Sequence, residues 1–336
     1  EAGNIVKDEK KYNEYKRSID EIRVLDLPKG INIAKPILML EKPYHGYIMR
    51  LVNDMIPIKK IMIPGDEGLA EFYLRTGGIY KRLRLLKNLA SILFKLHSRS
   101  IIYGDISPDN IFISKSLDYY EVWLIDADNM RYRMDFLKAI YTPGYGAPEI
   151  VNNISTNNTY SDVYSFALLA YELLTTISPF EGELVINGGE EESWDCDDTG
   201  TEENSEDFYA KAERGELPWV NDLIDTRNYN DKGIPPKIVI SKGIMELFQK
   251  TFSYVARNNA NERPSMREWY DAIDKASCAL IYCKKCKNAF YIGTDICPFC
   301  DETKDRAYLA QIYDILNLNE IVAEINSEGY AEKYKL

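Results

Sequence analysis

The stretch "IIYGDISPDNIFIS", Ile101–Ser114, places a polar loop between two short β-rich runs. The loop supplies Asp105, Asn110 and one further aspartate, and it contains no basic residue. The next β-rich run, "VWLID", ends at Asp126. Because a strand–loop–strand segment can bring its ends together, we expect the side chains of Asp105, Asn110 and Asp126 to lie close to one another.

These three residues suit the transfer of a phosphoryl group. Mg²⁺ prefers hard oxygen ligands and accompanies phosphate chains in such reactions. The carboxylate of Asp126 and the amide oxygen of Asn110 can hold Mg²⁺, which leaves Asp105 to orient an attacking hydroxyl and accept its proton. The loop therefore predicts a catalytic site and not a simple turn.

Five motifs, in order, resemble those of the eukaryotic-type protein kinase family over roughly residues 1–275. The loop "YGDISPDN" resembles the family's catalytic loop, H-R-D-x-x-x-x-N, and "DAD", 126–128, stands where the family has D-F-G. "TPGYGAPE", 142–149, resembles the end of the activation segment. "SDVYSFALLAYELL" resembles the central buried helix, and "ERPS" follows it further along the chain.

The resemblance assigns roles to these motifs. It implies that Thr142 braces Asp105 and the acceptor site. It also implies that Asp162 holds the backbone of the catalytic loop, and that Arg263 pairs with Glu149. A protein kinase of this kind transfers the γ-phosphate of ATP, with Mg²⁺, to hydroxyl groups of a protein substrate.

The implied fold is α+β and bilobal. Residues 1–52 would form a small β-rich lobe and hinge, with a helix over residues 8–25 and a start that is expected to be incomplete. Residues 53–277 would form a helical lobe, in which Ser161 and Ser265 are expected to cap helices. An acidic insert is expected at 188–207, a zinc ribbon at 278–303 and a helical tail at 304–336.

The first lobe offers candidates for binding ATP. "NIVK" resembles the family's V-A-I-K, and "DEIRVL" resembles the helix segment whose glutamate pairs with that lysine; Glu14 is the rival glutamate. "GYIMRLV" resembles the hinge, with a gatekeeper followed by residues that present backbone groups to adenine. A solvated surface position is the alternative for the lysine, and core packing for the gatekeeper. The expected contacts are Lys7, Glu21, Met49, Arg50, Leu51 and Val52.

Several residues depart from the family pattern. Tyr103 and Gly104 replace the motif histidine and arginine, so the loop is of the non-RD type and cannot sense an activation-segment phosphate through that arginine. Ser107 replaces a lysine that steadies the transferred phosphate, and Ala127-Asp128 replace Phe-Gly. No G-x-G-x-x-G loop is visible. The retained Asp105, Asn110 and Asp126 favour an active enzyme; the alternative is a pseudokinase scaffold, and transfer of another group from ATP is a weaker one.

Three further stretches indicate a narrower kinship. "AERGELPWVND", "IVISKGIMELFQKTF" and "ERPSMREW" resemble divergent bacterial kinases of tellurite-resistance-linked gene sets. Those kinases are associated with a von Willebrand A-type protein and a metal-dependent protein phosphatase. The resemblance implies a Ser/Thr protein kinase in a bacterial stress or signalling system, with these two proteins as candidate partners and no specific substrate.

Four of the six cysteines lie close together in the sequence. They form two C-x-x-C pairs ten residues apart: Cys283, Cys286, Cys297 and Cys300. Four thiolates with no open position describe a structural tetrahedral Zn²⁺ site, which predicts a zinc ribbon. Cys196 and Cys278 lie apart and are expected to be ordinary thiols.

Composition limits the remaining possibilities. The 336 residues carry a net charge of −12, which argues against general binding to nucleic acid or to a membrane surface. No apolar run reaches the roughly 18 residues of a membrane-spanning helix, and we expect a cytoplasmic protein. The acidic stretch Gly188–Asp207 is expected to be a solvated insert, with docking of a basic partner as the alternative.

Overall fold

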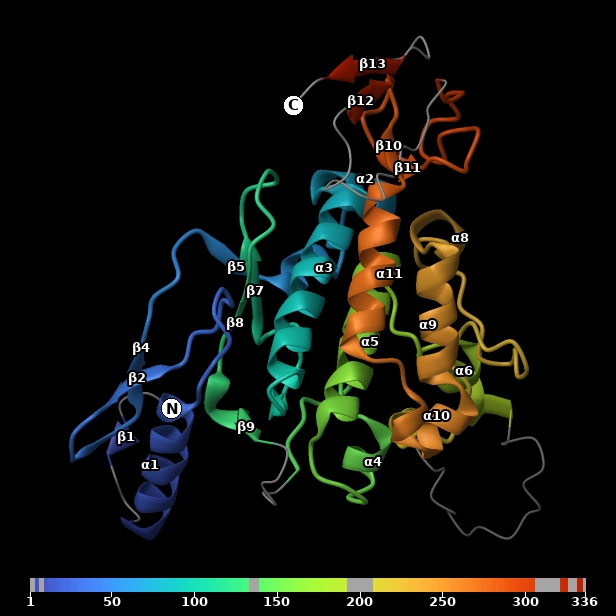
Figure 1. The fold of residues 1–336 in the computed structure, drawn as a ribbon. Helices are drawn as coiled ribbons and strands as arrows, with labels where there is room; N and C mark the ends of the chain where they lie inside the picture. The colour runs from blue at the N-terminus through green and yellow to red at the C-terminus, as the bar shows by residue number, and fades with distance from the viewer. Residues whose placement is uncertain are drawn as a thin grey trace, which may run out of the picture.

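The computed structural model describes residues 4–5, 9–132, 139–191, 208–305, 321–325 and 331–334. It confirms the predicted α+β architecture, in which a small strand-containing lobe is followed by a larger helical one (Figure 1). Within these ranges, no helix combines the length and the hydropathy that crossing a bilayer requires.

The described residues of the first lobe form two antiparallel strand pairs and one helix. Its elements are β1 (Asn4–Ile5), α1 (Glu9–Val24), β2 (Pro36–Met39), β3 (Tyr44–His45) and β4 (Tyr47–Met49). β1 pairs with β3, and β2 pairs with β4. α1 matches the helix predicted over residues 8–25, and its Ile19 and Ile22 side chains are buried. An acidic first turn and a basic last turn match the helix dipole.

Short strands flank the polar loop that contains Asp105 and Asn110. A three-stranded antiparallel sheet has the order β5-β7-β8, and β6 pairs with β9. The three-stranded sheet consists of β5 (Met55–Pro57), β7 (Ile111–Ser114) and β8 (Val122–Leu124). The separate pair consists of β6 (Ile101–Ile102) and β9 (Arg131–Tyr132). The loop therefore lies between β6 and β7, and Asp126 follows β8 directly. Two 3-10 turns lie nearby, η1 (Ile58–Ile61) and η2 (Ala127–Asn129).

The helical lobe is organised around α3 (Gly78–His97) and α5 (Thr159–Thr175). α5 is buried along nearly its whole length, as its uniformly apolar sequence predicts. The predicted cap at Ser161 is wrong: Asn158 is the N-cap, and Ser161 completes a capping box with it. The predicted cap at Ser265 is confirmed.

The remaining helices complete this lobe, and α11 packs along α3 (Figure 1). They are α2 (Leu69–Arg75), α4 (Pro148–Val151), α6 (Glu183–Glu191), α7 (Phe208–Glu213), α8 (Pro236–Val239), α9 (Lys242–Phe252), α10 (Tyr254–Asn258), η4 (Ala260–Glu262) and α11 (Met266–Cys278). Aromatic side chains of α5, α9 and α11 meet in the centre, where the Phe248 ring lies 5.0 Å from that of Trp269.

A buried arginine joins three parts of this lobe. Arg82 of α3 is fully buried, and its guanidinium donates to the carbonyl oxygens of Leu173 (2.9 Å) and Ile61 (2.8 Å) and to the Thr76 hydroxyl (2.8 Å). The guanidinium also lies 3.9 Å from the centroid of the Tyr73 ring. Burial lowers the pKa of Arg82 to about 10, so the group stays charged at neutral pH. Among the residues that the structure describes, carbonyl oxygens, a hydroxyl and an aromatic ring stabilise this cation, and no carboxylate pairs with it.

The cysteine-containing segment packs on the helical lobe. β10 (Leu280–Tyr282) and β11 (Ala289–Tyr291) form an antiparallel hairpin that follows α11 directly. Ala289 belongs to the same hydrophobic core as α3 and α5. The Tyr291 hydroxyl donates to the carbonyl of Val239 at 3.2 Å, and the Tyr282 ring lies 5.6 Å from that of Tyr80 in α3. The hairpin is therefore part of the lobe's packing.

The end of the chain differs from the prediction. The described parts of the expected helical tail are strands, β12 (Ile321–Ile325) and β13 (Ala331–Tyr334), which pair antiparallel. Short apolar runs are ambiguous between helix and strand, and "IVAEI" is rich in β-branched residues. Within the expected acidic insert, α6 extends to Glu191, and 192–207 lie outside the described residues.

Candidate active site

Asp105 is held at both of its carboxylate oxygens. Thr142 donates its hydroxyl to Oδ1 at 2.8 Å, and the Asn110 amide nitrogen donates to Oδ2 at 2.9 Å. That nitrogen also lies 3.0 Å from the Asp105 carbonyl, so the amide oxygen of Asn110 is the atom left for a cation. The structure thus brings Asp105, Asn110 and Thr142 together, although 37 residues separate Asp105 from Thr142.

The central helix fixes the backbone of this loop. Asp162 of α5 is 2% exposed and accepts from the backbone N–H groups of Tyr103 and Gly104, each at 2.9 Å. The His97 ring nitrogen lies 3.0 Å from the same carboxylate. Gly104 has a φ of +89°, and a Cβ there would lie 3.2 Å from the Asn129 carbonyl oxygen. The observed backbone therefore disfavours the motif arginine at this position.

Asp126 sits at a strained backbone position beside two other carboxylates. Its φ and ψ are both 58°, a left-handed conformation that is uncommon for residues other than glycine. A hydrogen bond with Asp128, burial, and repulsion from Asp128 and Asp105 raise the pKa of Asp126 from 3.8 to about 7. This donor set fits a divalent cation, whose charge would offset the repulsion.

Two tyrosines from the first lobe face this acidic group. The Tyr47 hydroxyl of β4 donates to Asp128 Oδ1 at 2.9 Å, across 81 residues of sequence. Burial and the negative charges of Asp128 and Asp126 raise the pKa of Tyr15, in α1, to about 12. The motif comparison missed both tyrosines because the family pattern assigns no role to these positions, and only their β-strand and helix periodicity marks them as inward-facing.

The expected ATP-positioning pair is not seen in the described residues. Glu21 pairs with Arg17, Nε to Oε1 at 3.0 Å, and its side chain is 61% exposed. It lines a cavity of about 580 Å³ that Asp128 also lines. The rival Glu14 is exposed as well. Lys7 lies outside the described residues, so its pairing with Glu21 stays a prediction.

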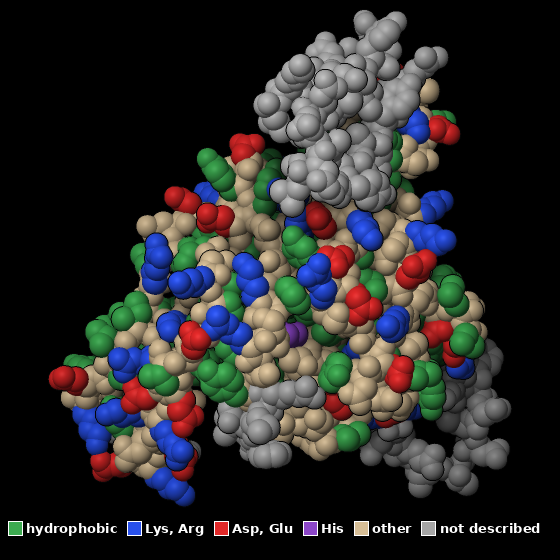
Figure 2. Space-filling view, in the orientation of Figure 1, with side chains coloured by type: hydrophobic (Ala, Val, Ile, Leu, Met, Phe, Trp, Pro, Cys, Tyr) green, Lys and Arg blue, Asp and Glu red, His purple; other side chains and the backbone are tan. Residues whose placement is uncertain are grey.

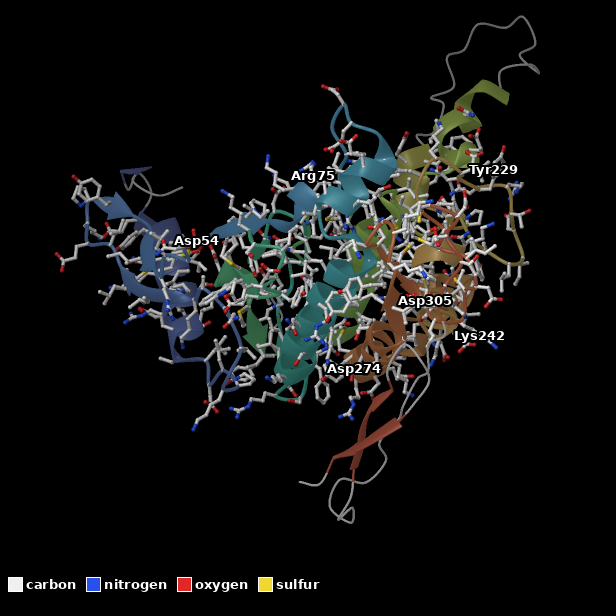
Figure 3. The ribbon with its side chains drawn as sticks, turned by 90° about the horizontal axis from the view of Figure 1, so that it is seen from above. Asp54, Arg75, Tyr229, Lys242, Asp274 and Asp305 are labelled. Carbon is white, nitrogen blue, oxygen red and sulfur yellow. The ribbon has the colours of Figure 1, made fainter. Side chains whose placement is uncertain are left out.

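The predicted hinge forms the connection between β4 and β5. Met49 ends β4 and is 43% exposed, so core packing does not account for it. The Arg50 guanidinium lies 5.6 Å from the Trp123 ring centroid, Leu51 is exposed and Val52 is half-buried. Asp54, labelled in Figure 3, follows with a left-handed φ of 56°.

A buried ion pair anchors the end of the activation segment. Arg263 donates through both terminal nitrogens to Glu149, at 2.8 and 2.7 Å. It also donates to the carbonyls of Ala256 and Tyr160, each at 3.1 Å, and its guanidinium lies 4.7 Å from the Tyr164 ring centroid. The contact predicted from the "APE" and "ERPS" motifs is thus present in the structure.

Ser107, at the position of the motif lysine, is buried. It is 1% exposed, and its hydroxyl has no hydrogen-bond partner among the described residues. The short, uncharged side chain of Ser107 cannot supply the positive charge of the motif lysine, so another group must steady the phosphate if transfer occurs.

The four cysteines of the two C-x-x-C pairs converge. The Sγ atoms of Cys283, Cys286, Cys297 and Cys300 all lie within 4.8 Å of one another. The closest pairs are 3.5 Å apart, too far for a disulfide and close to the spacing of thiolates about 2.3 Å from one tetrahedral ion. A hydrogen bond from the Cys286 backbone N–H lowers the pKa of Cys283 to about 7, whereas burial raises the pKa of Cys297 to about 12. The convergence of the four sulfurs is therefore the evidence for a metal site. The cluster can therefore bind a metal ion; Cys278 is exposed and apart from it.

Comparison with known proteins places this site in a family. The protein kinase domain matches residues 3–271 of the chain. A Ser/Thr-protein kinase of Myxococcus xanthus, pkn2, is 35% identical over 115 residues, 32% of this chain and 14% of that protein. Calcium-dependent protein kinase 5 of Plasmodium berghei is 25% identical over 283 residues, 76% of this chain and 45% of that protein. The chain spans less than half the length of these curated relatives. By its domain match, this chain belongs to the protein kinase family.

Proposed function

We propose that the protein is an active, non-RD Ser/Thr protein kinase that uses ATP and Mg²⁺. The observation that carries this proposal is the fixed orientation of Asp105, whose two oxygens are held by Thr142 and Asn110. A carboxylate held in this way is ready to receive a proton from a hydroxyl placed beside it. The similarity to Ser/Thr-protein kinases such as pkn2 supports the Ser/Thr class.

The transfer can be written from the residues of this chain. Asp105 orients the acceptor hydroxyl and takes its proton as the hydroxyl oxygen forms a bond to the γ-phosphorus of ATP. The bond between that phosphorus and its bridging oxygen breaks, ADP leaves, and the proton passes to solvent. Asp126 and Asn110 would hold Mg²⁺, which when bound neutralises charge on the phosphate oxygens. Thr142 keeps Asp105 turned toward the acceptor.

We further propose a bacterial stress or signalling role in the cytoplasm. Protein substrates follow from the family, and the candidate partners remain a metal-dependent protein phosphatase and a von Willebrand A-type protein. Lys and Arg side chains are interspersed with Asp and Glu on the face shown in Figure 2, which favours protein over nucleic-acid partners. The cysteine cluster is proposed to hold a structural Zn²⁺ through its four thiolates.

The second candidate is a pseudokinase scaffold. Two observations favour it. Ser107 is buried and stands in place of the lysine that steadies the transferred phosphate. Glu21 pairs with Arg17 on the exposed surface of α1, and the expected pair with an ATP-positioning lysine is not seen in the described residues. A scaffold of this kind would bind partners through the ribbon and the acidic insert.

One experiment separates the two. The purified chain is incubated with Mg²⁺ and γ-³²P-labelled ATP, with a generic protein acceptor, and intact mass is recorded in parallel. We expect Asp105→Ala to reduce transfer at least ~10²-fold, within the range for loss of a general base. Asp126→Ala should reduce transfer to a similar extent because it removes a proposed Mg²⁺ ligand. Asp118→Ala, at an exposed loop carboxylate, is the control.

A folded wild-type protein with neither transfer nor an ATP-dependent thermal shift would favour the scaffold. Unchanged transfer in Asp105→Ala would refute the role of that residue. The mass of the adduct would expose transfer of a group other than phosphoryl.

A further inference from the structure

Asn157 makes four hydrogen bonds from a buried position just before α5. Its amide nitrogen donates to the carbonyls of Gly104 (2.8 Å) and Ile140 (2.7 Å). Its amide oxygen accepts from the Ile140 N–H (2.8 Å) and from Arg131 Nη2 (2.7 Å). The side chain is 5% exposed, and these bonds use both donors and both lone pairs of the amide.

The partners of Asn157 come from three segments that meet at Asp105. Gly104 directly precedes Asp105 in the catalytic loop. Ile140 lies two residues before Thr142, whose hydroxyl donates to Asp105. Arg131 lies in β9, five residues after Asp126. One amide therefore joins the catalytic loop to both ends of the segment that runs from Asp126 to the acceptor site.

Gly104 is held from two sides by the start of α5. Asp162 accepts from its N–H at 2.9 Å, and Asn157 donates to its C=O at 2.8 Å. The peptide units on either side of Gly104 therefore have fixed orientations, and so does the Cα from which the Asp105 side chain extends. The bidentate pairing with Ile140 resembles a backbone ladder contact and fixes the segment just before Thr142.

We infer that Asn157 is a positioning residue that fastens the acceptor end of the activation segment to the catalytic loop through an uncharged amide. The segment consequently takes its place without a phosphate. Gly104 offers no side chain that could bind one. Within the described part of this junction, Arg131 is a buried cation that already donates to the Asn157 oxygen. This role deepens the proposed function and rests on it.

The test compares matched variants of the full chain. Asn157→Ala removes all four bonds, and Asn157→Asp keeps the shape but replaces both N–H donors with an acceptor that faces two carbonyls. Asn228→Ala is the control. Asn228 is also a fully buried asparagine, and its amide donates to the Phe180 and Pro218 carbonyls. It is distant from Asp105 in the sequence, and these partners do not belong to the catalytic loop.

Kinetics and amide exchange are measured below the unfolding midpoints of all variants. We expect both Asn157 variants to lower kcat/KM for the protein acceptor ~10–100-fold, because a small displacement of reacting groups has effects of that order. KM for MgATP should stay within twofold of wild type, and Asn228→Ala should keep both constants. Hydrogen exchange at the Ile140 amide should be faster in Asn157→Ala only, because Asp keeps the oxygen that accepts from this amide. Phosphatase treatment should leave wild-type activity unchanged.

Three results would overturn the inference. They are acceptor kcat/KM in Asn157→Ala within twofold of Asn228→Ala, unchanged exchange at Ile140, or loss of wild-type activity after phosphatase treatment. If the wild type transfers no phosphate at all, the proposed function fails. The exchange measurement then still decides whether Asn157 fastens the segment.

Discussion

Breaking the Glu149–Arg263 pair should destabilise the helical lobe strongly. Glu149→Ala leaves the fully buried Arg263 guanidinium without the acceptor of its two shortest bonds. Removing one partner of a buried ion pair costs about 3–5 kcal/mol. Arg263 keeps its bonds to the Ala256 and Tyr160 carbonyls, so we expect the lower end, about 3 kcal/mol.

That change corresponds to a fall in Tm of ~6–12 °C, from about 2–4 °C per kcal/mol for a domain of this size. Thermal unfolding followed by the fluorescence of the buried Trp219 and Trp269 measures it. Asp271→Ala, which removes the partner of Arg267 in an exposed i,i+4 pair, is the control and should leave Tm unchanged.

The double variant Glu149→Ala/Arg263→Met supplies the decisive comparison. Glu149→Ala leaves a buried positive charge without its partner, whereas the double variant has no charge at position 263. The double variant should therefore have a higher Tm than Glu149→Ala alone. Strictly additive effects, or a fall in Tm of less than about 3 °C for Glu149→Ala, would show that the pair is not energetically coupled and would refute this account.

Two further predictions concern the acidic site and the ribbon. In metal-free protein, Asp126 retains a proton between pH 3.8 and about 7 that the unfolded chain has lost, so its contribution to the free energy of unfolding falls as pH rises through this window. Asp128→Asn should weaken the pH dependence of Tm, measured by thermal unfolding with a chelator present. An unchanged slope of Tm against pH would show that Asp128 does not raise the pKa of Asp126. Cys297→Ser or metal chelation should lower Tm of the whole lobe because Ala289 lies in its core, whereas Cys278→Ser should not. Metal loss, measured by elemental analysis, without a change in Tm would contradict that coupling.

The sequence predicted those parts of the site whose spacing is local or whose partners belong to a known motif. Asp105 and Asn110 lie in one short loop, and the pairing of Glu149 with Arg263 follows from two recognised motifs. The cysteine cluster follows likewise from two C-x-x-C pairs, because each pair directs two sulfurs to one point.

The sequence did not predict contacts between loops that are far apart in the chain. Asn157 reaches Gly104 across 53 residues and Tyr47 reaches Asp128 across 81, and neither distance leaves a periodic signal. Glu21 shows a second limit, since a helical pattern predicts which face is buried but not how the helix is rotated toward a site. The cap of α5 shows the same limit on a small scale, because the sequence predicted Ser161 and the structure has Asn158 as the N-cap.

The hairpin of β10 and β11 has a consequence for the order in which the protein is made. It contributes Ala289 to the core that α3 and α5 share, yet it follows every other part of that lobe in the chain. During synthesis the catalytic loop, the activation segment and α5 all leave the ribosome before the hairpin that completes their core. A ribosome-bound chain that ends before residue 289 therefore carries every residue of the candidate active site on an unfinished lobe.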